Sequence, residues 1–183
     1  AWAKPRVHSP LEAEIGEEKC SELAAADIII ERDTRCDFAA NPTMHAKKDA
    51  EGNWTERRFC IDWRNANNQM CSDGYVPQLP EQIFRNLSGS KVFSKLDLRS
   101  GFHQIPIHEN SQHVTSFWWG RKLYQFTRLP MGIKTAVAIF QRTMDEVLQR
   151  AGLTHCACVF VDDVIVHSKT MEEHLECLSL IHI

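Results

Sequence analysis

Two runs of apolar, mostly β-branched residues near the C-terminus constrain the fold most strongly. They cover 156–161 and 164–166, and only Asp162 and Asp163 separate them. Two such runs with so short a connection predict an antiparallel hairpin in a buried sheet. Adjacent carboxylates repel each other unless a cation lies between them. The acidic pair therefore marks either an ordinary turn or a site for a divalent cation, and taken alone it does not decide between them.

Helical spacing, period-two alternation and turn residues place the remaining elements. Helices are expected at 9–27, 80–87, 135–150 and 171–180. Strands are expected at 43–48, 57–63, 92–98, 103–107, 114–119 and 122–126. The strands at 43–63 and 114–126 form two hairpins in this interpretation. Strands interleaved with helices in this way predict an α/β (α+β) fold in which the helices cover one face of a sheet.

Composition and charge narrow the class of protein. A chain of 183 residues with 43% hydrophobic and 25% charged residues fits one globular domain and excludes a disordered chain. Residues 42–134 carry 13 basic and 8 acidic side chains, whereas both flanking segments are acidic. A central basic block suits a polyanion, although an ordinary solvated surface is the stronger interpretation of the block taken alone.

The cellular location is predicted from cysteines and from apolar runs. Seven cysteines without framework spacing suit a reducing compartment, and no apolar run approaches the ~20 residues of a membrane span. No secretory signal is visible in residues 1–10. We therefore expect an intracellular protein that is neither secreted nor bound to a membrane.

A third carboxylate favours the metal site over the turn. Asp97 ends the predicted strand 92–98, and Ser100-Gly101 breaks the chain directly after it. If that strand and the 156–166 hairpin are neighbours, Asp97 and Asp162 would converge on a shared pair of magnesium ions. Two such ions about 4 Å apart activate an attacking hydroxyl and stabilise a departing pyrophosphate.

Four motifs in a fixed order resemble the reverse transcriptase of long-terminal-repeat retroelements, of the Ty3/Gypsy type. They are RFCIDWRNAN at 58–67, FSKLDLRSGFHQI at 93–105, LPMGIKTAVAIFQRTM at 129–144 and FVDDVIVHS at 160–168. The resemblance implies the fingers and palm of a right-hand polymerase, with an antiparallel palm sheet and without the thumb. Residues 1–9 would be a tail, 10–90 and 107–134 fingers, and 91–106 and 135–183 palm.

The resemblance also assigns roles to individual residues. Asp97, Asp162 and Asp163 match the three catalytic, metal-binding aspartates, and Phe160 stands where Tyr is usual. Gln141 and Arg142 match residues beneath the template track. The nucleotide-binding positions are Lys47, Arg58, Leu98, Ser100, Gly101, Phe102 and Met131. Among these, Lys47 and Arg58 hold the triphosphate, the amides of Ser100 and Gly101 cradle phosphate oxygens, and Phe102 excludes a 2′-hydroxyl.

The resemblance implies an RNA-directed DNA polymerase from a retroelement Pol polyprotein. It would use two Mg²⁺ ions, or Mn²⁺, to add deoxynucleoside triphosphates to a primer on an RNA or DNA template. The thumb, connection, ribonuclease H, protease and integrase of such polyproteins would lie elsewhere in the full-length protein. A catalytically silent nucleic-acid-binding remnant and an unrelated magnesium phosphohydrolase are the rival hypotheses.

The sequence has two departures from the family pattern and two further features with alternative interpretations. Thr135-Ala136-Val137 replaces the usual Asn-Ala-Pro, and Met131, where Phe is common, is equally well explained as packing. His155, Cys156 and Cys158 suggest zinc, but buried strand cysteines are the stronger interpretation. Residues 178–183 are similar to a translated sequencing adapter, and the end of an amphipathic helix is the alternative.

Overall fold

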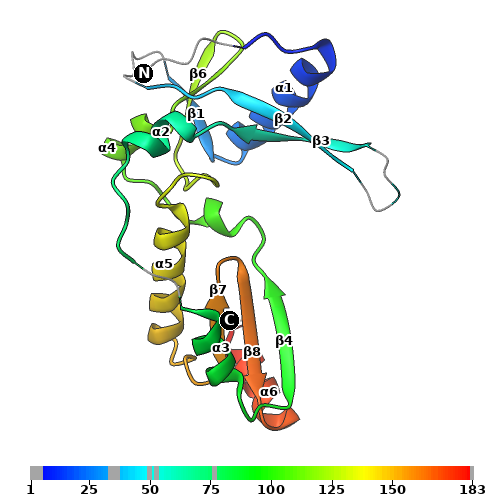
Figure 1. Ribbon diagram of the computed structural model, residues 1–183, viewed down its shortest axis with the longest axis vertical. Coiled ribbons are helices and arrows are strands. Elements are labelled where there is room, and N and C mark those ends of the chain that lie inside the picture. The colour runs from blue at the N-terminus through cyan, green and yellow to red at the C-terminus, as the bar shows by residue number, and fades with distance from the viewer. Residues whose placement is uncertain (1–5, 33–37, 49–50, 52–53, 76–77, 182–183) are drawn as a thin grey trace. The chain divides into compact units, whose positions relative to one another are not determined.

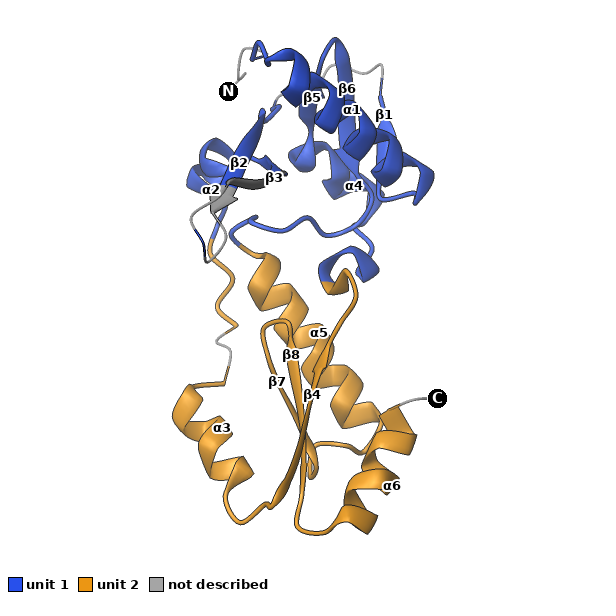
Figure 2. Ribbon diagram, turned by 90° about the vertical axis from the view of Figure 1, so that its right-hand side faces the viewer, with its two compact units in different colours: residues 1–71, 102–134 blue, residues 72–101, 135–183 orange. Residues whose placement is uncertain are grey.

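The computed structural model describes residues 6–32, 38–48, 51, 54–75 and 78–181, and the side chains of 47, 48 and 54–57 lie outside it. The chain divides into two compact units (Figure 2). Unit 1 comprises Ala1–Cys71 and Phe102–Lys134, and unit 2 comprises Ser72–Gly101 and Thr135–Ile183. These divisions place residues 72–90 with unit 2, whereas the predicted fingers extended to residue 90. The assignment of fingers and palm stays a prediction.

Unit 1 begins with helix α1 (Pro10–Ala25), as predicted. Ser9 caps it, since the Glu12 amide donates to Ser9 Oγ at 3.4 Å and the Ser9 amide donates to Glu12 Oε2 at 3.0 Å. This reciprocal capping box satisfies two amides that the first helical turn leaves without partners, and Pro10 needs none. The start of the helix is therefore specified by local sequence.

Two small antiparallel sheets complete the frame of unit 1. Strands β1 (Ile29–Glu31), β6 (Lys122–Phe126) and β5 (Phe117–Trp119) form one sheet in that order, and β2 (Pro42–Lys48) pairs with β3 (Trp54–Ile61) in the other. The two predicted hairpins are thus present. Phe117 is fully buried, and its ring lies 5.4 to 5.6 Å from those of Phe126 and Tyr124. Four short helices follow β3 or precede β5 along the chain: α2 (Arg64–Gln69), η1 (Gly101–Gln104), α4 (Glu109–Gln112) and η2 (His113–Thr115).

The predicted strand at 103–107 is wrong. Residues 101–104 form the 3₁₀ turn η1, and the Ile105 amide donates to the carbonyl of Phe102 at 3.1 Å. Only an isolated bridge between Pro106 and Arg128 follows. Apolar residues at every second position resemble a strand, but Pro106 has no amide hydrogen with which to extend a ladder. The missed strand β1 and helix α2 are too short to show a period of their own.

Unit 2 is built on one three-stranded antiparallel sheet (Figure 1). Strand β8 (Asp163–Ser168) is central, with β4 (Val92–Asp97) on one side and β7 (Ala157–Phe160) on the other. Helices α3 (Pro80–Leu87), α5 (Ala136–Arg150) and α6 (Met171–Ile181) complete the unit. All six elements were predicted from the sequence, with bounds that differ by at most a few residues.

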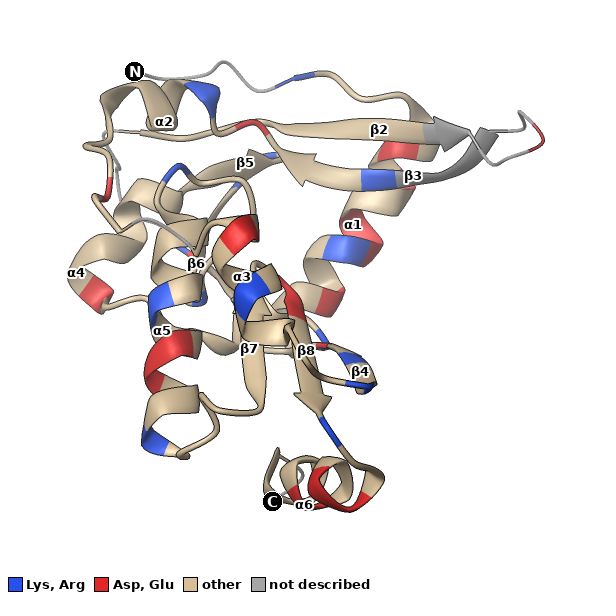
Figure 3. Cartoon of the chain, turned by 60° about the horizontal axis from the view of Figure 1, so that its bottom comes forward, with Lys and Arg blue, Asp and Glu red and all other residues tan. Residues whose placement is uncertain are grey.

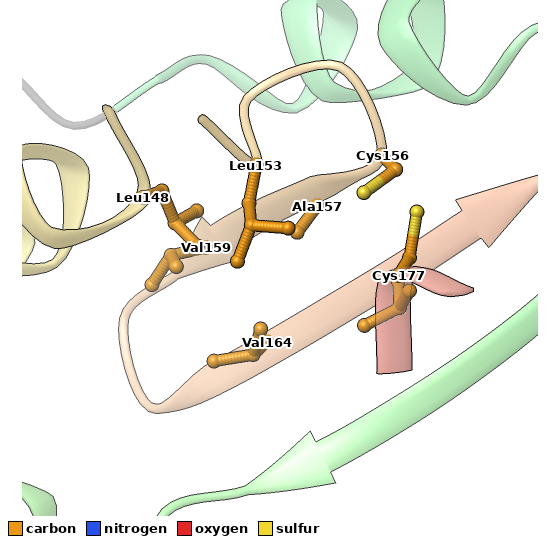
Figure 4. Close-up of a cluster of buried hydrophobic side chains, with 8 residues drawn as sticks. Leu148, Leu153, Cys156, Ala157, Val159, Val164 and Cys177 are labelled. Atoms are coloured by element: carbon orange, nitrogen blue, oxygen red, sulfur yellow. The ribbon is translucent and has the colours of Figure 1, made fainter. Parts of the chain in front are cut away.

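The core of unit 2 explains why α5 and α6 cover the same face of this sheet. Leu148 of α5 and Cys177 of α6 pack with the strand residues Val159 and Val164 and with Leu153 in one buried cluster (Figure 4). Val164 and Val166 of β8 are buried in this cluster, whereas Asp163 and Ile165, which point to the other face of the strand, are half-buried. The prediction of an antiparallel sheet with helices on one face is confirmed. None of the helices among the described residues is long and apolar enough to span a bilayer.

Candidate active site

Three carboxylates meet at one end of the unit 2 sheet. Asp97 is the last residue of β4 and lies directly opposite Asp163, the first residue of β8. Asp162 occupies the turn that joins β7 to β8. Residues directly opposite each other on antiparallel strands project to the same face. The expected convergence of Asp97 with the acidic pair therefore agrees with the strand register.

The electrostatics of this cluster favour a cation. Burial raises the pKa of Asp162, and the charges of Asp163 and Asp97 raise it further. Within the described part of the chain, Oδ1 of Asp162 is buried and accepts no hydrogen bond. A buried carboxylate oxygen without a donor, beside two more carboxylates, is the oxygen-rich donor set that hard divalent cations prefer. The residues present fit a divalent metal site.

Lys95 is a contact of this cluster that the sequence analysis did not single out. Its Nζ lies 2.9 Å from Oδ2 of Asp163. Lys95 and Asp97 are two positions apart on β4, so both project from the same face of the strand. The two-residue spacing from Asp97 was therefore the sequence signal that could have predicted a place for Lys95 beside the carboxylates. Both side chains of the ion pair are substantially exposed, so the pair contributes little to stability.

The turn that carries Asp162 has a strained backbone. Val161 has a φ of 55°, in the left-handed region that β-branched residues rarely adopt. The Gln141 side chain binds the backbone at this residue and two residues before it. Its Oε1 accepts from the Val161 amide at 3.2 Å, and its Nε2 donates to the Val159 carbonyl at 3.0 Å. The surrounding structure thus fixes a conformation that the local sequence disfavours.

Gln141 and Arg142, the predicted template contacts, have different environments. Gln141 is 0% exposed and bonds the β7–β8 turn, so its side chain is not accessible to a nucleic acid in this structure. The Arg142 side chain is 42% exposed, and its guanidinium donates to Asp73 at 2.6 Å. Helical spacing does not distinguish these neighbours, because the burial of Gln141 depends on a turn 20 residues away.

The predicted phosphate-binding loop follows β4. Ser100 has a φ of 51°, and the Gly101 amide donates to the Leu98 carbonyl at 3.3 Å. A Cβ on Gly101 would lie 3.1 Å from the Phe140 ring and 3.2 Å from the Leu98 Cβ. Close packing therefore disfavours a larger residue at Gly101, while the binding of phosphate by Leu98, Ser100 and Gly101 stays a prediction.

The other predicted nucleotide contacts lie in unit 1. Arg58 is exposed on β3, opposite His45, and Lys47 lies in β2 with its side chain outside the described part. Phe102 is only 5% exposed, and Met131 is 60% exposed. The structure thus assigns these four positions to one unit and the three aspartates to the other.

Two residues of the first motif hold the loop that carries Met131. Trp63 Nε1 donates to the Met131 carbonyl at 3.0 Å. Asn67 Nδ2 donates to the Gly132 carbonyl at 3.0 Å, and Asn67 Oδ1 accepts from the Lys134 amide at 2.8 Å. The separation of 65 to 68 residues explains why no local pattern predicted these contacts.

The cysteines of unit 2 pack in its core. Cys156 and Cys177 face each other among apolar side chains (Figure 4), and with His155 they place three ligand atoms within 4.8 Å of one another. Burial is the main cause that raises the pKa of Cys156 to about 12, so its thiol is neutral. Cys158 is buried as well and lies outside that group. The interpretation of the strand cysteines as buried core residues is confirmed.

Charge differs between elements (Figure 3). Helix α6 carries Glu172, Glu173 and Glu176 and no Lys or Arg, while α5 carries both signs. The acidic surface of α6 repels a polyanion, whereas the exposed Arg58 of β3 attracts one. The basic central segment of the sequence therefore remains the better candidate for contact with phosphates.

Known proteins share both sequence and fold with this chain. Residues 49–182 match the family described as reverse transcriptase (RNA-dependent DNA polymerase). The retrovirus-related Pol polyprotein from transposon gypsy of Drosophila melanogaster is 41% identical over 128 residues, which is 69% of this chain and 12% of that polyprotein. The enzymatic polyprotein of cauliflower mosaic virus (strain D/H) is 30% identical over 97% of this chain and 26% of its own length.

A solved structure has a fold similar to that of this chain. The foamy viral protease-reverse transcriptase in complex with an RNA/DNA hybrid superposes with a TM-score of 0.77 at 24% identity, over 98% of this chain and 23% of that chain. The chain thus spans about a quarter or less of these relatives. The match of the family over most of the chain, together with the aspartate register, identifies the chain as a member of the reverse transcriptase (RNA-dependent DNA polymerase) family.

Proposed function

We propose that this chain forms the fingers and palm of an RNA-directed DNA polymerase from a retroelement Pol polyprotein. It would add deoxynucleoside triphosphates to the 3′-hydroxyl of a primer on an RNA or DNA template. One observation carries the proposal: Asp97 lies opposite Asp163 on paired strands, next to the turn that holds Asp162. Membership of the family makes nucleotidyl transfer the chemistry that such a carboxylate cluster serves.

Reverse transcriptases use divalent metal ions, and Asp97, Asp162 and Asp163 would hold two of them in this chain. We expect Mg²⁺, with Mn²⁺ as a substitute, because all the donors are carboxylate oxygens. When bound, such ions lower the pKa of a primer hydroxyl and neutralise charge on the triphosphate. The protein's own part would be to hold Asp162 in a strained turn and to place its Oδ1, which accepts no hydrogen bond from the described residues, beside the two other carboxylates.

Residues of unit 1 would bind the incoming nucleotide. Arg58 is exposed on β3 and suits bidentate contact with phosphate, and Lys47 would add a point charge from the paired strand. Phe102 would limit the space at the sugar, and Met131 is exposed for contact with a base. Leu98, Ser100 and Gly101 of unit 2 would approach the phosphates through their backbone.

The remaining partners would come from outside these residues. Arg142 is the exposed candidate for contact with the template, since Gln141 is buried. The thumb, connection, ribonuclease H, protease and integrase would lie in the rest of the polyprotein, and synthesis would take place in the cytoplasm or in retroelement particles.

Primer extension on poly-rA with an oligo-dT primer and Mg²⁺ tests the proposal. The assay compares the 183-residue chain with Asp162→Asn, each alone and each fused to a thumb, because a chain without a thumb grips its primer-template poorly. We expect incorporation that Asp162→Asn removes. No Asn-sensitive incorporation in any form would reject the proposal. Template binding without incorporation would instead support the silent remnant of the same fold.

A further inference from the structure

We propose that Asp145 and Tyr75 are positioning residues for the catalytic turn, and that they act through Gln141. The Tyr75 hydroxyl donates to Asp145 Oδ2 at 2.5 Å, and Asp145 Oδ1 accepts from Gln141 Nε2 at 3.0 Å. Gln141 Oε1 then accepts from the amide of Val161, next to Asp162. The catalytic meaning of this turn rests on the proposed function, whereas the hydrogen bonds themselves do not.

The direction of each hydrogen bond in this series follows from which groups can donate and which can accept. A carboxamide has two donors on its nitrogen and an acceptor oxygen. The Val159 carbonyl and an ionised Asp145 only accept, and the Val161 amide only donates. A flipped Gln141 would place its oxygen against two acceptors and its nitrogen against a donor. Asp145 and Val159 therefore select the orientation that offers Oε1 to Val161.

Tyr75 fixes the carboxylate that makes this selection. Its hydroxyl binds Oδ2, so both oxygens of Asp145 are engaged. Asp73 holds Tyr75 in turn, because it accepts from the Tyr75 amide at 2.9 Å and from Arg142 at 2.6 Å. The Arg142 guanidinium also lies 5.0 Å from the centre of the Tyr75 ring. The hydrogen bond to Asp145 raises the pKa of Tyr75, which keeps its hydroxyl a donor at neutral pH.

The bond to Val161 matters because the turn is strained. With a φ of 55° at a β-branched residue, Val161 keeps its conformation only while its neighbours hold it. A turn that relaxes would shift Asp162 relative to Asp97 and Asp163. Small displacements of catalytic groups cost large factors in rate, so a buried bond behind the turn influences catalysis without touching substrate.

Amide hydrogen exchange of the 183-residue chain tests the proposal directly. Asp145→Leu removes both acceptors at similar volume, and we expect the Val161 amide to exchange roughly tenfold faster. The amides of Val164 and Val166, in the central strand β8, should stay within about twofold. Asp145→Asn still offers one acceptor to Gln141, so it should restore Val161 exchange to within about threefold. Tyr75→Phe should give a smaller increase, about threefold.

A matched control and a catalytic measurement complete the test. Glu146→Leu removes the neighbouring carboxylate of α5, which is exposed and lies 3.5 Å from Arg150, and should leave Val161 exchange unchanged. In the thumb fusion, Asp145→Leu should lower kcat roughly tenfold while the KM for nucleotide changes less than twofold. Glu146→Leu should change neither.

Two results would overturn the proposal. One is unchanged Val161 exchange in a folded Asp145→Leu chain, and the other is equal acceleration at Val161, Val164 and Val166, which would mark general destabilisation. These results are independent of polymerase activity. If the wild-type chain fused to a thumb fails to extend a primer, the proposed function is rejected. Faster exchange in Asp145→Leu at Val161 alone, and not at Val164 or Val166, would still support the positioning role.

Discussion

The two β-hairpins that carry the predicted chemistry are built in opposite ways. The β7–β8 hairpin belongs to a three-stranded sheet, packs against α5 and α6, and holds its acidic turn through the buried Gln141. The β2–β3 hairpin is a two-stranded sheet that displays Arg58 and Cys60 to solvent. Its contact with the rest of unit 1 includes Phe59, whose ring lies 5.5 Å from that of Trp119.

The difference corresponds to what each hairpin has to do. Repelling carboxylates stay together only on a rigid support, because each of them gains by moving away from the others. A cation that captures a triphosphate needs exposure and reach instead. We infer that the buried hairpin sets catalytic geometry and that the exposed hairpin sets substrate affinity.

The largest expected effect is on the buried hairpin. Asp163→Asn removes one of three carboxylates and should lower incorporation by the thumb fusion about a thousandfold, since the metal site loses a charged donor. Single-turnover primer extension measures the loss. Glu172→Gln, on the exposed face of α6, is the control that should retain full activity. Equal losses of incorporation in Asp163→Asn and Glu172→Gln would contradict a special role of the carboxylate cluster relative to the exposed surface of α6.

Thiol labelling compares the two hairpins without any assay of activity. Cys60 of β3 is exposed, whereas Cys158 of β7 is 5% exposed and burial raises its pKa. A maleimide at pH 7 should modify Cys60 at least about a hundredfold faster than Cys158, because a buried neutral thiol reacts only after local opening. Mass spectrometry of digests measures the rates. Comparable labelling rates at the two cysteines would contradict the inference that the β7–β8 hairpin is the more rigid of the two.

A smaller effect is expected at the exposed hairpin. Arg58→Ala should raise the KM for nucleotide by about 10- to 30-fold and change kcat less than threefold, because the lost contact is made equally in the ground and transition states. Arg58→Lys should recover part of the affinity. Arg121→Ala, at another exposed arginine, is the matched control. A fall in kcat at constant KM would instead place Arg58 in the chemical step.

The smallest effect is the pH dependence of stability without divalent cations. The pKa of Asp162 is raised above its ordinary value of 3.8, so the folded state binds this proton more tightly than the unfolded state. The resulting stabilisation is complete below pH 3.8 and is lost as the pH rises through the raised value. Asp162→Asn should therefore gain stability relative to wild type as the pH rises from 3.5 to 7.

Urea unfolding at several pH values measures this difference between Asp162→Asn and wild type. Added Mn²⁺ should reduce it, because the cation stabilises the ionised carboxylate of the wild-type protein. Asp97→Asn, which removes one of the repelling charges, should produce a change of the same sign. A difference that shrinks with rising pH in the absence of metal would contradict the repulsion inferred at the turn.

Local patterns predicted the elements that carry strong periodicity. The apolar runs around Asp162 and the helical spacing of 136–150 gave the buried hairpin and α5, because both follow from residues adjacent in sequence. The failures have a different physical origin. The strand predicted at 103–107 ignored the missing amide of Pro106, and the burial of Gln141 depends on a turn far along the chain. The resemblance named Gln141 but not its contacts.

The convergence of Asp97, Asp162 and Asp163 on one cation-binding spot is tested most directly by a crystal structure grown with Mn²⁺ and recorded at the manganese absorption edge. We predict an anomalous peak about 2.2 Å from carboxylate oxygens of both Asp97 and the β7–β8 turn. No peak at that place, or an Asp97 carboxylate on the opposite face of β4, would contradict the account.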